Sequence, residues 1–130
     1  MDQDPATAYL AAHILTAPPS EQLLLTYEAA LREVERAREA WVRGDPHGAR
    51  AADARLTQLL LLLLGAVDPG PDPVLAGRLV TLYQWCLARL GEETADRAGV
   101  YDKVRSVLAG LYTAFAEAAK ASRRNASGAR

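Results

Sequence analysis

Apolar residues recur at helical spacing in four segments of the chain that contain no internal proline. In residues 19–43 the apolar positions lie three or four residues apart, and charged residues occupy the opposite side. Residues 46–67 and 100–121 each show one such stripe, whereas residues 73–90 show two adjacent stripes. No segment shows the sustained period-2 alternation of a strand. The pattern therefore predicts an all-α protein with four long helices.

Proline and glycine mark the breaks between these segments. Gly44 is suited to end a helix, and the pairs Asp45-Pro46 and Asp72-Pro73 each place an N-cap before a proline at the first helical position. The short connections predict an antiparallel four-helix bundle over residues 19–121. A short N-terminal helical segment, within residues 1–18, is expected to form a partly mobile cap. The small, polar and basic residues 122–130 are expected to be a disordered tail.

Composition and charge exclude several classes of protein. The 130 residues include 15 basic and 16 acidic ones, and half of the chain is hydrophobic. This balance argues against nucleic-acid binding and against general disorder. No apolar run is long enough to insert into a membrane, and the acidic start of the chain is unlike a secretory signal. A single cysteine, Cys86, suits a reducing compartment, so a cytoplasmic location is predicted.

No residue pattern indicates catalysis or a bound cofactor. The two histidines, His13 and His47, lie far apart, and no Glu-x-x-His pair or glycine-rich phosphate loop occurs. Cys86 falls on an apolar stripe and is expected in the core. We therefore predict no catalytic residue, no metal site, no cofactor and no enzymatic activity.

Six consecutive leucines, at positions 59–64, form the most informative feature of the sequence. At about 100° per residue they go more than once around a helix, so Leu61 and Leu62 fall on its polar side. Exposed leucines of this kind usually mark an interaction site. The alternative is that this helix is central and covered on both sides. Trp85, outside both stripes of its segment, and Tyr83 are aromatic anchors for a partner helix, with the core as their alternative place.

Three motifs follow one another in the order and spacing of a known family. The first motif consists of Tyr-Leu-Ala-Ala-His-Ile-Leu-Thr-Ala-Pro-Pro at 9–19, followed by Leu-Leu-Leu-Thr-Tyr-Glu-Ala-Ala at 23–30. The second motif is Leu-Tyr-Gln-Trp-Cys-Leu-Ala-Arg-Leu at 82–90. Val-Arg-Ser-Val-Leu-Ala-Gly-Leu at 104–111 precedes Ala-Phe at 114–115. Over about residues 8–118 the chain resembles the flagellin-specific export chaperones of the FliS family. Pro18 replaces the serine that usually caps the first long helix, which leaves Thr16 as the expected cap.

The resemblance implies a cytoplasmic chaperone that is not an enzyme. It would bind the C-terminal helical segment of flagellin, prevent premature polymerisation and assist flagellar type III export, with the export apparatus as a further partner. The N-terminal segment would cover part of the binding surface and compete with the client. The alternative is a self-associating structural or regulatory bundle with another protein partner, including a homodimer through the leucines. The residues expected to contact a partner are Tyr9, Ile14, Leu23, Tyr27, Leu61, Leu62, Tyr83 and Trp85.

Overall fold

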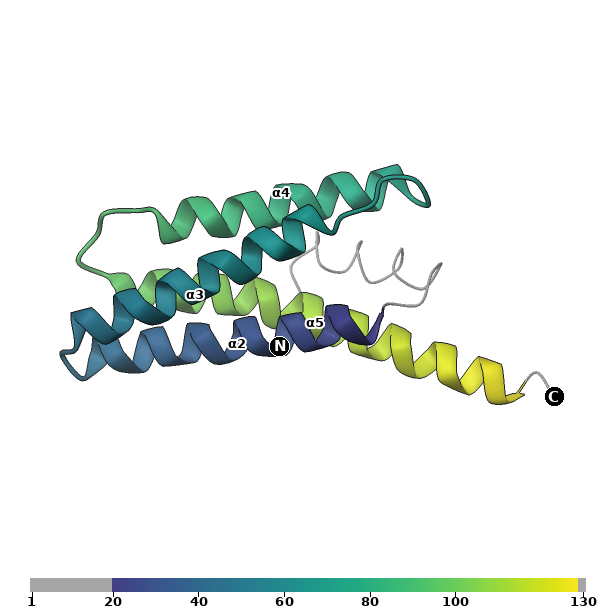
Figure 1. The fold of residues 1–130 in the computed structure, drawn as a ribbon, viewed down its shortest axis with the longest axis horizontal. Coiled ribbons are helices and arrows are strands. Elements are labelled where there is room, and N and C mark those ends of the chain that lie inside the picture. Colours follow the sequence, from purple (N-terminus) through teal and green to yellow (C-terminus); the bar gives the residue numbers. More distant parts are fainter. Residues whose placement is uncertain (1–19, 129–130) are drawn as a thin grey trace.

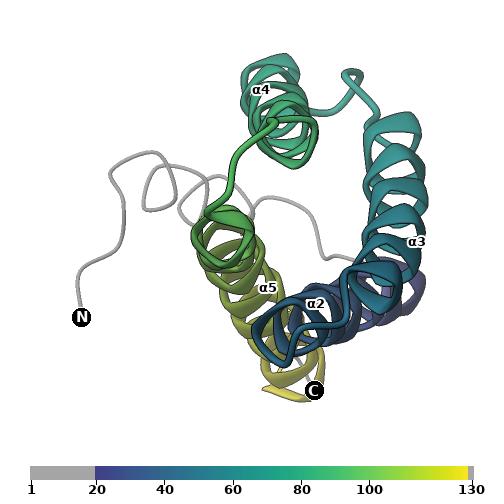
Figure 2. The ribbon, with the colours of Figure 1, turned by 90° about the vertical axis from the view of Figure 1, so that its left-hand side faces the viewer.

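The computed structural model describes residues 20–128, and all regular structure in that range is helical. The helices are α2 (Glu21–Val42), α3 (Pro46–Gly65), α4 (Pro73–Leu90) and α5 (Arg97–Gly128). Successive helices run in opposite directions (Figure 1), and each packs on two neighbours: α2 and α4 both contact α3 and α5. Viewed end-on, the four helices form a ring with α2 and α4 at opposite corners (Figure 2). The predicted all-α four-helix bundle is confirmed.

A short polar side chain caps the start of every helix that the structure describes. The carboxylates of Asp45, Asp72 and Asp96 accept hydrogen bonds from the backbone three residues later, at 2.9, 3.1 and 3.0 Å. For α2 the hydroxyl of Ser20 accepts from the backbone of Leu23 at 3.0 Å. The prediction that Thr16 caps this helix is therefore wrong, because α2 begins at Glu21 and Ser20 stands directly before its first turn.

The core lies along the axis of the ring and is filled by the apolar stripes of all four helices. At its centre Tyr27 of α2 and Tyr83 of α4 meet across the ring, with their hydroxyl oxygens 2.5 Å apart. The ring of Phe115 packs 5.4 Å from that of Tyr27. Cys86 is also fully buried, as the sequence predicts. Burial raises the pKa of Tyr27 well above its usual value, and it raises the pKa of Tyr83 and of Cys86 to about 12.

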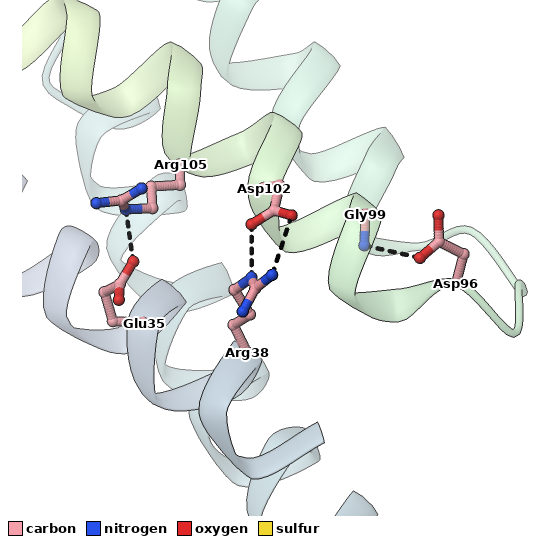
Figure 3. A network of polar contacts seen from close by, with 6 residues as sticks. All are labelled: Glu35, Arg38, Asp96, Gly99, Asp102 and Arg105. Carbon is pink, nitrogen blue, oxygen red and sulfur yellow. Dashed lines mark hydrogen bonds and ion pairs between the residues drawn. The ribbon is translucent and has the colours of Figure 1, made fainter. Parts of the chain in front are cut away.

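Ion pairs follow the seam between α2 and α5. Arg38 donates to Asp102 at 2.6 Å, and Glu35 accepts from Arg105 at 2.5 Å (Figure 3). These side chains are largely exposed, and ion pairs that water can reach contribute little to stability. They therefore orient the two helices more than they stabilise them.

One charged side chain is buried between α2 and α3. Glu33 is 8% exposed, and its carboxylate accepts hydrogen bonds from Arg36 at 2.9 Å and from Arg55 at 3.0 Å. Because a carboxylate that loses water must be paired, the two guanidinium groups explain why a glutamate is tolerated at this position.

The C-terminal end differs from the prediction. Residues 122–130 were expected to be a disordered tail, but α5 continues through residues 122–128 to Gly128. The physical reason is that residues 111–127 contain no proline or glycine and are rich in alanine, the strongest helix former. Residues 123–128 are exposed, and this end of α5 projects beyond the other helices (Figure 1).

Candidate functional site

The turn between α2 and α3 brings the first residues of one helix beside the last residues of the other. Gly44 adopts a φ of 82°, a left-handed conformation that favours glycine, and this allows the chain to reverse directly after α2. From this reversal the two helices run side by side along their lengths. The start of α2 therefore lies against the leucine-rich end of α3.

A cavity of about 320 Å³, the α2–α3 groove, opens at this place. It is lined by Ser20, Gln22, Leu23, Thr26, Leu62, Leu63 and Ala66. The hydroxyl of Thr26 is already satisfied by the carbonyl of Gln22 at 2.8 Å. The groove therefore offers mostly hydrocarbon, with polar groups at the Ser20 and Gln22 end.

The groove unites two residues that the sequence analysis singled out separately, Leu23 and Leu62. It also contains Thr26 and Ala66, which the sequence analysis did not anticipate. Pairing positions at equal distances from Gly44 along the two antiparallel helices would have found both, since such positions face one another in a tight hairpin.

Leu61 and Leu62 are exposed to 52% and 64%. Neighbouring helices in the described part of the chain do not cover them, so the alternative of a fully covered α3 does not hold. Leu59, Leu60, Leu63 and Leu64 are buried or half-buried, as the helical geometry predicts. The surplus hydrocarbon of the leucine run is therefore on the outside of the bundle.

Trp85 lies on α4 and is not among the residues of the α2–α3 groove. Its ring is half-buried, and the guanidinium of Arg89 lies 5.3 Å from the ring centre. Arg89 in turn forms an ion pair with Glu92 at 3.3 Å. Trp85 is therefore partly accessible at a second place on the surface, where a cation already occupies one side of the indole.

The structure places Tyr27 and Tyr83 in the core instead of on the surface. They are 0% and 1% exposed, and each hydroxyl has the other as its hydrogen-bond partner. Both residues lie on inward stripes, and each hydroxyl oxygen takes part in the hydrogen bond across the ring. Their expected role as partner contacts has no support in this arrangement. Tyr9 and Ile14 lie outside the described residues.

The opposite end of the bundle carries a pocket of about 530 Å³, in which apolar side chains surround a small group of charged ones. Inside it, Arg97 donates to the carboxylate of Asp53 at 2.6 Å and to the carbonyl of Glu92 at 2.7 Å. The hydroxyl of Tyr101 donates to the same carboxylate at 3.0 Å, and burial raises the pKa of Tyr101. These groups satisfy one another and join α3 to the first turns of α5 and to the connection that precedes α5. No local sequence pattern could reveal a contact between residues 53 and 97.

Residues 20–128 contain neither a metal-binding cluster nor a membrane-spanning helix. No group of three or more histidine, cysteine, aspartate or glutamate side chains there could hold a metal ion. None of the described helices is both long and apolar enough to cross a membrane.

Comparison with known proteins gives one match. The family model described as flagellar protein FliS matches residues 1–122, which is nearly the whole chain. No curated protein and no solved structure matches the sequence. The match covers all of α2, α3 and α4 and most of α5, and the helical architecture agrees with that family. The chain belongs to the FliS family of flagellar chaperones.

Proposed function

We propose that this protein acts in the cytoplasm as an export chaperone that binds the C-terminal segment of flagellin. Binding would keep flagellin from polymerising early and would deliver it to the flagellar export apparatus. The observation that carries the proposal is the α2–α3 groove with the exposed leucines beside it, in a chain of the FliS family. The client would dock apolar side chains against Leu23, Leu61 and Leu62, and Trp85 would offer a second contact on α4.

The energetics of such binding follow from the nature of the surface. A disordered tail that folds on the bundle must offset its own ordering cost, so apolar burial has to supply the binding free energy. Full burial of a leucine side chain contributes about 1.5–3 kcal/mol, and Leu62 has 64% of its surface still to bury. We therefore expect a negative heat-capacity change and a gain of helix on binding. Salt should have little effect, because the charges of the chain nearly balance.

The decisive experiment compares two variants with equally exposed apolar positions. Leu62→Lys changes the groove, whereas Val42→Lys changes a residue that is 63% exposed at the far end of α2. Both positions are in or near the last turn of a helix, where a lysine is tolerated. Isothermal titration with a peptide of the flagellin C-terminal segment should show binding at least about tenfold weaker for Leu62→Lys only. Equal affinities for both variants, with unchanged melting temperatures, would refute the proposed site.

The N-terminal residues Tyr9 and Ile14 belong to the same proposal as a competing cap. Deletion of residues 1–15 should leave the bundle folded and increase the affinity for the flagellin peptide. Cooperative unfolding by circular dichroism and the same titration test this together. Loss of cooperative folding in the shortened chain would show that the segment is part of the core.

A further inference from the structure

The seam between α2 and α3 continues from the α2–α3 groove to a group of arginine side chains. Positions at equal distances from Gly44 face one another in this hairpin, which sets Thr26 beside Leu62 in the groove. The same rule sets Glu33 beside Arg55 further along, where the two side chains are hydrogen-bonded. Between these places each helix advances by seven residues, which is close to two full turns and roughly 10 Å. The groove and Arg55 therefore lie on one side of the hairpin.

The arginine group, consisting of Arg32, Arg36 and Arg55, carries more positive charge than its neighbours balance. The buried carboxylate of Glu33 accepts from both Arg36 and Arg55, so two guanidinium groups share one negative charge. The side chains of these two arginines are still 59% and 53% exposed. Arg32, one turn before Arg36, is exposed and forms no ion pair with a described residue. Even with the exposed Glu39 one turn after Arg36, three cations face two anions.

The other carboxylates near this seam are bound on another side of the bundle. Glu28 accepts from the hydroxyl of Tyr112 at 2.8 Å, and Glu35 accepts from Arg105 at 2.5 Å, both on α5. In α3, residues 56–61 contain no acidic residue. No described carboxylate between the groove and the arginine group is therefore available to neutralise it.

We propose that the client binds this seam as a helix and carries an aspartate or glutamate two turns away from the apolar residue that covers Leu62. This inference rests on the proposed function and names the chemistry that the site selects in its client. The apolar residue would occupy the groove, and the carboxylate would accept hydrogen bonds from Arg55 and Arg36. Seven residues of a client helix span the same distance of roughly 10 Å, so both contacts fit one straight helix.

The guanidinium groups are already positioned for such a carboxylate. Arg55 uses Nε and Arg36 uses Nη1 for Glu33, and the other nitrogens of both have no acceptor among the described residues. Because Glu33 holds both groups, little further ordering is needed when an anion binds. Hydrogen bonds between a guanidinium and a carboxylate are also among the stronger ones in proteins.

This contact would give the apolar groove its specificity. Apolar burial is not directional, so the groove alone accepts many amphipathic helices. The arginine group adds a requirement for a carboxylate at one spacing, and it opposes a helix that carries lysine there. Salt screens the contact little, because it is local and the bound client covers part of it.

Two matched substitutions test the contact. Arg55→Gln and Arg105→Gln each remove an arginine that pairs with a glutamate of α2, and the two side chains are 53% and 55% exposed. Isothermal titration with a peptide of the flagellin C-terminal segment should show binding about tenfold weaker for Arg55→Gln only. Equal affinities for both variants would overturn the proposal. Glu33 keeps Arg36 in Arg55→Gln, and Arg36→Gln is a second variant for the case that the first does not fold.

A double-mutant cycle tests the spacing. Each acidic residue of the peptide is changed to its amide and each large apolar residue to alanine, and every peptide is titrated against the natural chain, Arg55→Gln and Leu62→Ala. One carboxylate should couple to Arg55 and one apolar residue to Leu62, about seven residues apart. No coupled carboxylate, or one at another spacing, would overturn this inference, while weaker binding by Leu62→Lys would still support the proposed function. A natural chain that does not bind the peptide would overturn both.

Discussion

Tyr27→Phe and Tyr83→Phe each remove one of the two hydroxyl groups that meet at the centre of the bundle. Each hydroxyl is fully buried, and its one hydrogen bond to a described residue is to the other hydroxyl. In either single variant the remaining hydroxyl loses that partner inside the core. Leaving a buried polar group unpaired costs about 1–3 kcal/mol. We therefore expect each single variant to lose about 1–2 kcal/mol of unfolding free energy.

The double variant should be less destabilised than the sum of the two singles. With both hydroxyls removed, no buried polar group is left unpaired, and the aromatic rings keep their packing against Phe115. One hydroxyl proton of the natural pair also lacks an acceptor among the described residues, because two hydroxyls share one hydrogen bond. Its removal offsets part of the cost, so the double variant should lie within about 1 kcal/mol of the natural protein.

Urea unfolding followed by far-UV circular dichroism measures all four proteins of this cycle. The expected coupling between the two changes is about 1–3 kcal/mol. Tyr112→Phe serves as a control, because its hydroxyl bonds at 2.8 Å to Glu28 at the surface, where water can replace it. This control should cost clearly less than either central substitution. Additive losses from the two central substitutions would refute the idea that the hydroxyls depend on each other.

Three further predictions concern pH, the Asp53–Arg97 pair and the C-terminus. The free energy of unfolding should keep its full value below about pH 9 and fall as the pH rises toward 12. In the unfolded chain Cys86 and Tyr83 lose their protons at ordinary pKa values, whereas burial holds both pKa values at about 12 in the folded protein. Urea midpoints that do not change between pH 8 and pH 11 would contradict this. Arg97→Met should cost about 2–3 kcal/mol, because the carboxylate of Asp53, with 18% of its side chain exposed, loses the guanidinium that pairs with it; chemical unfolding measures this loss, and a value below about 0.5 kcal/mol would contradict the inferred pairing. A chain ending at residue 122 should melt within about 2 °C of the full chain by calorimetry, because residues 123–128 are exposed; a larger drop would mean that this end of α5 packs on the bundle.

Helical periodicity and break residues were enough to predict the four helices within residues 20–128, most of their boundaries and the exposure of Leu61 and Leu62. Periodicity placed Tyr27 and Tyr83 on inward stripes, and only their aromatic character and the family resemblance suggested a partner role. Neither stripe could show that their hydroxyls meet, because that contact joins two helices. The contact between Asp53 and Arg97 depends on how three elements assemble, and neither residue stands out locally. For α5, the small and polar residues of the last turns predicted disorder, but the absence of proline and glycine from residues 111–127 allows the helix to continue.

The leucine run has a consequence for how α3 is aligned in the bundle. A rotation of about 100° with a shift of about 1.5 Å moves each residue to the place of its neighbour. Within residues 59–64 this exchange replaces leucine with leucine, so the second half of α3 carries little information about its own register. The first half carries that information instead, through the Asp45 cap, the Asp53–Arg97 pair and the Arg55–Glu33 pair. Polar contacts at one end of the helix therefore decide which leucines face outward at the other.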